Sequence, residues 1–217
     1  MSPLPPEAKA AVVFGGTFDP PHLAHTRLVP RLRDEAEPGA WLLYVPAARS
    51  PHKAEPPTAD NHRVAMLHAA LAGTDRAAVW TDELDRPGPS YTIDTLERLH
   101  AACPAVRLRL LIGADQAAAF HRWKSAREIL ALATPLVMLR TPLADRASLM
   151  GALRDAGVWS EAELSRWEAC IAPAPVVDVS ATELRESLKT TPRDRARLHG
   201  LLDPRVLAYI ESHGLYR

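Results

Sequence analysis

Short apolar runs alternate with amphipathic segments along most of the chain. The apolar runs have the length of strands and are rich in β-branched or bulky residues; they are Ala10–Phe14, Trp41–Val45, Ala77–Thr81, Val106–Ile112, Leu136–Leu139 and Val176–Val179. Segments with helical spacing lie between or after them, at Asp60–Ala72, Thr92–Ala102 and Asp203–His213. Near-continuous apolar strands that alternate with helices indicate a parallel sheet covered on both faces. The pattern predicts an α/β fold, a doubly wound Rossmann-like parallel sheet with right-handed crossovers.

Two stretches depart from this alternation. Thr141–Pro175 is helical in character but poorly patterned, and we expect an inserted pair of helices there. Pro46–Pro57 contains four prolines and no periodicity, which predicts a long exposed loop of the kind that is often functional. With no internal repeat to divide it, the chain is expected to form one domain over residues 1–217.

Composition narrows the class of protein. Hydrophobic residues make up 47 % of the 217 residues, which is enough for a sizeable core and argues against global disorder. Lys plus Arg and Asp plus Glu both number 26, which argues against a nucleic-acid binder but leaves room for a local basic pocket. The two cysteines lack the spacing of a disulfide framework or a zinc site. No signal peptide or membrane span is seen, so we expect a cytoplasmic protein that binds no membrane.

The segment after the first predicted strand carries the strongest chemical signal; it reads Gly15-Gly16-Thr17-Phe18-Asp19-Pro20-Pro21-His22-Leu23-Ala24-His25. Two glycines at a strand end allow a sharp turn, and a helix from about Leu23 points its free amides at the same place, which suits a phosphate. His22 and His25 face one side of a helical turn and form a cation-capable pair that could grip a polyphosphate. The alternative is an ordinary turn with two incidental histidines. A metalloprotease zinc motif is excluded, because its histidines are four apart with a Glu between them.

This segment resembles the first signature, Thr-x-x-Pro-x-His-x-Gly-His, of the α/β nucleotidyltransferases, which transfer a nucleotidyl group from ATP or CTP. In detail it is similar to the bacterial nicotinate-nucleotide adenylyltransferase branch. One departure is Ala24, which stands where the family usually has Gly and adds a methyl group. The resemblance places ATP against Gly15, Gly16, Thr17, Phe18, His22 and His25.

A second match follows the last predicted strand, at Val179–Arg185. Ser180 and Glu183 form a capping box, which explains both residues without any ligand. It does not explain Arg185, whose guanidinium near a helix N-terminus favours an anion. The segment resembles the family's Ile-Ser-x-Thr-x-x-Arg signature, which implies that Ser180, Thr182 and Arg185 bind the ATP phosphates.

Gly113 and Asp115 follow the fourth strand. In a sheet ordered 3-2-1-4-5, the carboxyl ends of strands one and four flank one crevice, so these residues should face Gly15 and Gly16. Asp115 could accept hydrogen bonds from ribose hydroxyls there; the alternative is a helix cap.

The acceptor side is indicated by two further matches. Pro89-Ser90-Tyr91-Thr92, with Thr95-Leu96, resembles the family's Pro-Ser-Tyr-Thr-x-x-Thr-Leu segment and opens a helix. Its free amides and the Thr92 hydroxyl could hold a pyridine carboxylate, with Ser90 and Tyr91 beside them. Phe120–Trp123 resembles the family's Phe-x-x-Trp, whose indole stacks on the nicotinate ring. Trp123 is alternatively a half-buried packing residue, and Lys124 either adds a favourable charge or is solvated.

Two last matches lie in the proline-rich loop and at the C-terminus. Pro51-His52-Lys53 resembles the family's Pro-Pro-His-Lys/Arg, with Ser50 in place of the first proline. Lys53 would then reach the ATP phosphates; the alternative is a solvated lysine. Val206–Ile210 and Gly214–Arg217 also resemble the family's C-terminus.

Together these resemblances imply transfer of the adenylyl group of ATP to nicotinate mononucleotide, giving nicotinate adenine dinucleotide and pyrophosphate in NAD biosynthesis. The mononucleotide phosphate is already a nucleophile, so catalysis needs positioning and charge stabilisation by His22, His25, Lys53 and Arg185. No carboxylate cluster suggests a metal site, and Mg²⁺ is expected to arrive on ATP. Rival interpretations are a related enzyme for nicotinamide mononucleotide or phosphopantetheine, and a non-catalytic nucleotide sensor. The oligomeric state stays open, a homo-oligomer included.

Overall fold

The computed structural model describes residues 2–48, 57–172, 181–189, 198 and 200–216. Lys53, Ser180 and the predicted strand Val176–Val179 lie outside these described residues.

The centre of the fold is a parallel sheet with the order β3-β2-β1-β4-β5. Its strands are β1 (Ala10–Gly16), β2 (Trp41–Pro46), β3 (Ala77–Val79), β4 (Arg107–Gly113) and β5 (Ala133–Met138). The predicted order 3-2-1-4-5 is confirmed, and it places Gly16 and Gly113 at the carboxyl ends of the two neighbouring central strands.

The limits of the strands differ most from expectation at β5. The apolar run predicted a strand over Leu136–Leu139, but the strand begins at Ala133 and includes Thr134 and Pro135. Among the described strands β5 pairs with β4 alone, and an edge strand tolerates a proline because its missing N–H can face away from the ladder. β3 is shorter than predicted and ends at Val79.

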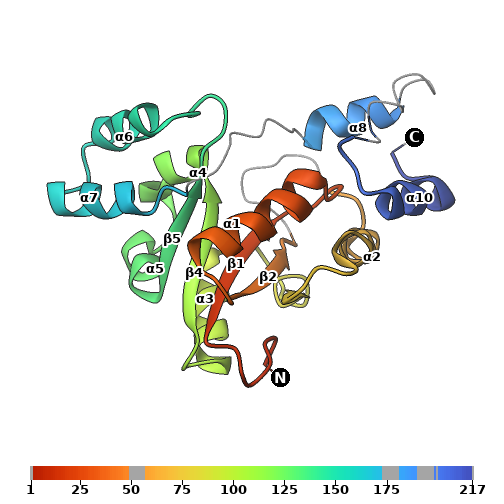
Figure 1. The fold of residues 1–217 in the computed structure, drawn as a ribbon, viewed down its shortest axis with the longest axis horizontal. Coiled ribbons are helices and arrows are strands. Elements are labelled where there is room, and N and C mark those ends of the chain that lie inside the picture. The colour runs from red at the N-terminus through yellow and green to blue at the C-terminus, as the bar shows by residue number, and fades with distance from the viewer. Residues whose placement is uncertain (1, 49–56, 173–180, 190–197, 199, 217) are drawn as a thin grey trace.

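Helices cover both faces of the sheet, as predicted (Figure 1). They are α1 (Val29–Ala36), α2 (Asp60–Leu71), α3 (Thr92–Ala102), α4 (Ala114–Ala118), α5 (Ala126–Leu132), α6 (Arg146–Asp155), α7 (Glu161–Ala169), α8 (Ala181–Lys189) and α10 (Pro204–His213). Alternate strand residues face opposite sides: Val13 and Leu43 join one buried cluster with α3, α5, α6 and α7, whereas Val12 and Leu42 join another with α1 and α2. A third cluster holds α8 and α10 against α2, at the opposite end of the molecule from α6 and α7 (Figure 1).

Local signals explain where several helices begin and end. α3 spans the predicted residues, and α10 begins after the capping Asp203 and ends at Gly214, whose φ of 60° is left-handed. From the sequence, Asp60 is a candidate cap at the start of the segment Asp60–Ala72, but the structure contradicts this: Ala59 occupies the cap position of α2. Asp60 is the first helical residue, where its carboxylate pairs with Arg63. The predicted pair of helices in 141–175 forms as α6 and α7, each opened by a capping box.

None of the helices in the described ranges is long and apolar enough to cross a membrane.

Candidate active site

The turn after β1 is tightly packed against its own strand. Phe18 adopts a left-handed φ of 51° and turns its ring under Gly16, where an added Cβ would lie 3.0 Å from the ring. Position 16 therefore excludes larger residues unless Phe18 moves. Phe18 is 2 % exposed and its ring packs against Phe14 and Tyr44, so the ring is not available to stack on a nucleotide.

A buried arginine that no sequence motif indicated supports the turn after β1 by hydrogen bonds. Arg63 of α2 donates to the main-chain oxygens of Thr17 (2.7 Å) and Thr58 (3.0 Å) and pairs with Asp60. Its side chain has no exposed surface, and these acceptors satisfy the guanidinium that burial would otherwise penalise. The sequence carries only a weak indication that Arg63 is buried and paired, namely the Asp60 carboxylate three residues earlier.

His22 and His25 stack at this turn. Their ring centroids are 3.6 Å apart with an interplanar angle of 22°, so the prediction that both imidazoles face one side is confirmed. The main-chain N–H of His22 donates to Nδ1 of His25 at 3.3 Å, which places the proton of a neutral His25 on Nε2. Nδ1 of His22 is buried without a hydrogen-bond partner among the described residues. The pair therefore holds unused hydrogen-bonding capacity in a shielded place.

Burial keeps both rings neutral. Loss of solvent, and then the charge of Arg140, lower the pKa of His22 from 6.5 to about 4. Burial, followed by His22 and Arg140, lowers the pKa of His25 well below its ordinary value. The pair that the sequence marked as cation-capable is therefore neutral near pH 7 in the free protein. The rings can serve as neutral N–H donors, and the positive charge for an anion must come from other side chains.

Arg140 is one such side chain, and no motif pointed to it. It follows β5 at the carboxyl edge of the sheet and forms a two-pronged ion pair with Asp115, Nε to Oδ1 at 2.7 Å and Nη2 to Oδ2 at 2.6 Å. Gly113 makes room for this pair, because a Cβ there would lie 2.7 Å from Asp115 Oδ1 and 3.0 Å from Arg140 Nε. The sequence signal that could have indicated Arg140 is its position just after β5, the strand that pairs with β4.

Asp115 is less free than the sequence suggested. Both carboxylate oxygens accept from Arg140, and Oδ2 also accepts from Gln116 at 3.0 Å. Burial raises the pKa of Asp115, but the hydrogen bonds from Arg140 and Gln116 outweigh it and hold that pKa below its ordinary value. Asp115 lies in the first turn of α4, whose cap position is Gly113, so the helix-cap alternative does not describe it. It is an ionised acceptor that Arg140 orients.

Arg185 reaches the histidine turn from α8. Its Nη1 donates to the main-chain oxygen of Asp19 at 2.8 Å, and Nη2 donates to Thr182 Oγ1 at 3.3 Å. The structure thus brings together two signatures that lie 166 residues apart. Two other residues predicted to bind the ATP phosphates, Ser180 of the second signature and Lys53 of the proline-rich loop, lie outside the described residues.

The acceptor-side residues gather at the start of α3. Tyr91 is the cap residue of α3 and its side chain caps no amide, which leaves the first-turn N–H groups from Thr92 onward open to an anion. Ser90 Oγ accepts from the main-chain N–H of Ala48 at 3.3 Å. Lys124 Nζ lies 3.1 Å from Asp94 Oδ1 and 4.5 Å from the centroid of the Tyr91 ring. These contacts place the segment that carries Trp123 close to the start of α3.

Trp123 has a packing role in addition to any role at the site. Its ring stacks on Phe120 with centroids 4.8 Å apart, and Phe120 packs edge-on against Trp167. One face of the indole is therefore covered, and a ligand ring could stack only on the other.

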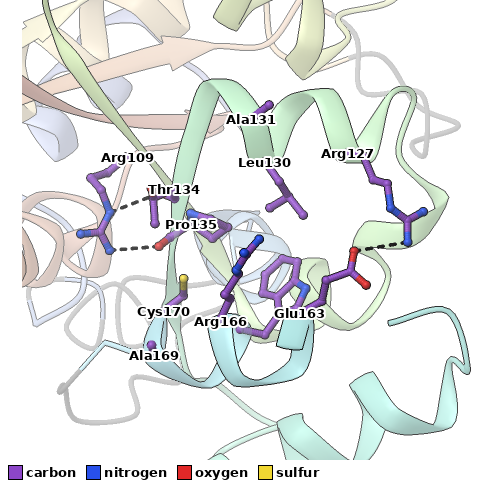
Figure 2. A pocket seen from close by; sticks show the side chains of 11 residues that line it. Arg109, Arg127, Leu130, Ala131, Thr134, Pro135, Glu163, Arg166, Ala169 and Cys170 are labelled. Carbon is purple, nitrogen blue, oxygen red and sulfur yellow. Dashed lines mark hydrogen bonds and ion pairs between the residues drawn. The ribbon is translucent and has the colours of Figure 1, made fainter. Parts of the chain in front are cut away.

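A separate cavity of about 650 Å³ lies between α5, β5 and α7 (Figure 2). Figure 2 shows Arg109 bonded to the main chain at Thr134 and Pro135, and Arg127 paired with Glu163. None of the residues predicted from the sequence to form the site lines it. Within the described ranges, no group of three or more His, Cys, Asp or Glu side chains could hold a metal ion.

Comparisons with known proteins identify the family of the chain. Residues 13–187 match the cytidylyltransferase-like family. The chain is 34 % identical over 206 residues to a "Probable nicotinate-nucleotide adenylyltransferase" of Gemmatimonas aurantiaca, covering 94 % of this chain and 91 % of that protein. It is 39 % identical over 214 residues to the protein of the same name from Chromobacterium violaceum, covering 94 % and 97 %.

Solved structures share the fold. The nicotinic acid mononucleotide adenylyltransferase of Plasmodium falciparum, complexed with NaAD, superposes with a TM-score of 0.69 at 16 % identity over 96 % of this chain and 97 % of that one. The same Plasmodium enzyme complexed with APC gives a TM-score of 0.67.

Proposed function

Because the chain belongs to the cytidylyltransferase-like family and, within it, to the nicotinate-nucleotide adenylyltransferases, we propose that its crevice joins ATP to nicotinate mononucleotide. The products are nicotinate adenine dinucleotide and pyrophosphate, a step of NAD biosynthesis. The observation that carries the proposal is the stacked, buried pair of His22 and His25 at the carboxyl end of β1, with Arg185 and Arg140 beside it.

The reaction needs no general base. A phosphate oxygen of the mononucleotide bonds to the α-phosphorus of ATP, and the bond from that phosphorus to the bridging β-phosphate oxygen breaks. The electron pair of that bond leaves with pyrophosphate. Because the attacking phosphate is ionised at neutral pH, the protein contributes orientation and stabilisation of shifting charge.

The histidines act as donors to the α-phosphate in this proposal. Neutral imidazole N–H groups in a dry site are pre-oriented toward the place where charge redistributes and need no reorganisation during the reaction. Main-chain N–H groups of Gly15–Phe18 and of the turn that leads from there toward α1 complete the proposed phosphate-binding site. Gly113 leaves room for the Asp115–Arg140 ion pair, and Asp115, oriented by Arg140, accepts from a ribose hydroxyl.

Positive charge for the leaving pyrophosphate comes from arginine and lysine. Arg185 and Thr182 lie at the histidine turn, and we assign the β- and γ-phosphates to them, with Ser180 and Lys53 as further ligands. An enzyme acting on ATP implies a divalent metal; we propose Mg²⁺, entering on the ATP phosphates as part of the substrate and keeping most of its waters.

The acceptor lies at the start of α3 in this proposal. The open amides, the Thr92 hydroxyl and the positive end of the helix complement a pyridine carboxylate, with Ser90 and Tyr91 beside them. The uncovered face of Trp123 stacks on the ring, and Lys124, although paired with Asp94, adds positive charge nearby.

Pyrophosphate release tests the function directly. The purified protein is given ATP or CTP with nicotinate mononucleotide, nicotinamide mononucleotide or phosphopantetheine. We expect release with ATP and nicotinate mononucleotide, and a kcat/KM at least about tenfold lower with the amide, whose NH₂ would leave donors of the pocket unpaired. Equal efficiency with both mononucleotides would contradict the donor-lined pocket. Nucleotide binding without release in any combination would instead identify a non-catalytic sensor.

A further inference from the structure

The C-terminal segment Gly214–Arg217 matched the family in sequence, but the proposed mechanism uses none of its residues. Its described part folds back on the site. Gly214 ends α10 in a left-handed conformation, and the N–H of Leu215 donates to the oxygen of Ile210 at 3.1 Å. This reversal aims the Tyr216 side chain at the turn after β1, where its hydroxyl donates to Asp19 Oδ1 at 2.5 Å.

Asp19 is a junction of three distant segments. Besides Tyr216, its Oδ2 accepts from the main-chain N–H of Thr58 at 3.2 Å, just before α2. Its main-chain oxygen accepts from Arg185 at 2.8 Å. Asp19 is 6 % exposed and stands three residues before His22. The orientation of this one residue is therefore linked to Arg185 on one side and to the histidines on the other.

Two further contacts hold the C-terminal region against the same turn. The N–H of Leu23, between the two histidines, donates to the oxygen of Leu201 at 2.8 Å. Apolar side chains of α8 and α10, including Leu184 and Ile210, pack on Met66 of α2 in one buried cluster. Burial and the Asp19 carboxylate both raise the pKa of Tyr216, so its hydroxyl remains a donor throughout the neutral range.

We propose that Tyr216 is a positioning residue for adenylyl transfer: through Asp19 it orients the guanidinium of Arg185 and the turn that carries His22 and His25. The inference rests on the function proposed above. A partly exposed arginine such as Arg185 has several rotamers, and a displacement of about 1 Å at a phosphate site can lower turnover about a hundredfold. A short hydrogen bond from a half-buried phenol to a buried carboxylate limits such displacement.

Tyr216→Phe tests the proposal, with Tyr209→Phe as the matched control. Tyr209 lies on α10 in the same region, but its hydroxyl contacts His62 Nδ1 at 3.0 Å and not Asp19. We expect Tyr216→Phe to lower kcat/KM for ATP about tenfold, because a hydrogen bond to a charged group is lost, and to leave KM for nicotinate mononucleotide unchanged. Tyr209→Phe should leave both unchanged. Wild-type kinetics in Tyr216→Phe, or a rise in the KM for nicotinate mononucleotide as large as the loss in kcat/KM for ATP, would overturn the proposal.

A double-mutant cycle with Asp19→Ala separates positioning from general stability. If Tyr216 acts through Asp19, adding Tyr216→Phe to Asp19→Ala causes no further loss in kcat/KM for ATP. Losses that multiply would show that Tyr216 acts independently and would overturn the proposal. Thermal unfolding of all variants is measured in parallel, and a change in Tm without a change in ATP kinetics would likewise contradict it.

ATP binding keeps this inference separate from the function itself. If the wild-type protein releases no pyrophosphate with any acceptor, the proposed function fails, but calorimetric titration with ATP still compares the two phenylalanine variants. Weaker ATP binding by Tyr216→Phe than by Tyr209→Phe supports the positioning role, and equal binding overturns it.

Discussion

The candidate active site at the carboxyl ends of β1 and β4, called the crevice because ATP is proposed to bind there, holds Arg140 and Arg185. The cavity between α5, β5 and α7 also holds arginine side chains, but the polar groups of the two regions differ in their hydrogen-bond partners. In the cavity, Arg109 and Arg127 are bonded to main-chain oxygens or to Glu163, and burial raises the pKa of the Cys170 thiol and keeps it protonated. In the crevice, His22 is buried with Nδ1 unpartnered among the described residues, and the pKa of each histidine is strongly lowered.

The difference shows that volume alone does not mark the functional site. The cavity, at about 650 Å³, has the size of a small-molecule pocket, yet its Arg109 and Arg127 side chains are already held by main-chain oxygens and by Glu163. The crevice combines desolvated titratable groups with charges brought from distant segments, which is the pattern typical of active sites. Five experiments test this difference between the two regions.

Removing one crevice donor should have the largest effect. We expect His22→Ala to lower kcat by about 10²–10³, or about 2.7–4 kcal/mol, by analogy with the loss of one oxyanion donor. ATP should still bind through the main-chain amides of the turn. Steady-state kinetics and ATP titration measure the two effects, with thermal unfolding as the control for folding. Near-normal turnover in a folded variant would remove His22 from the mechanism.

Acid should destabilise the protein through the same histidine. The folded-state pKa of His22, about 4, lies below the unfolded value of about 6.5, so the unfolded chain binds the proton more readily. The stabilisation is present above pH 6.5 and is lost as the pH falls toward 4, by about 3 kcal/mol from His22 alone. Urea unfolding at pH 7, 5 and 4 measures it. His22→Ala should flatten this dependence, and an unchanged slope in that variant would contradict the assignment.

Arg140→Ala should affect the crevice more moderately. It removes the partner of a half-buried Asp115 and a positive charge beside the histidines, so we expect kcat/KM for ATP to fall about tenfold. The pKa of His22 should rise but stay below 6.5, because burial is the larger cause of its shift. Kinetics and NMR titration of the His22 ring measure both. Arg146→Ala, which breaks an exposed pair with Glu168, is the control and should change neither.

Thr92→Val tests the acceptor side of the crevice. Loss of one hydroxyl donor should reduce the preference for nicotinate over nicotinamide mononucleotide by up to about tenfold. The KM for ATP should change less, since Thr92 lies at the start of α3 and not at the histidine turn. Competition kinetics with the two mononucleotides gives the ratio. A proportional loss toward ATP would place Thr92 outside the acceptor pocket.

The cavity should show the smallest effect. Arg166→Ala changes its lining without reaching the crevice, so we expect kcat and both KM values to stay within about twofold of wild type. A loss comparable to that of Arg140→Ala would mean that the cavity takes part in the reaction and would break the contrast.

Periodicity and turn chemistry determined the architecture without help from the structure. Apolar runs predicted the five described strands, their observed order is that of the doubly wound sheet which the alternation indicated, and α3 and α10 follow from their apolar stripes and end residues. These signals are local, because burial on both faces imposes a composition on each strand separately. The spacing of His22 and His25 predicted shared orientation for the same reason.

Which groups meet, and how they are charged, depends on the packing of distant segments. Arg63, Arg140 and Tyr216 reach the site from α2, from the end of β5 and from the C-terminus, and no spacing in the sequence connects them to the histidines. The neutral state of His22 and His25 also escaped prediction, because a pKa depends on burial and on charges from distant segments. Local patterns specify elements, whereas solvent exclusion and long-range pairing arise only when those elements pack.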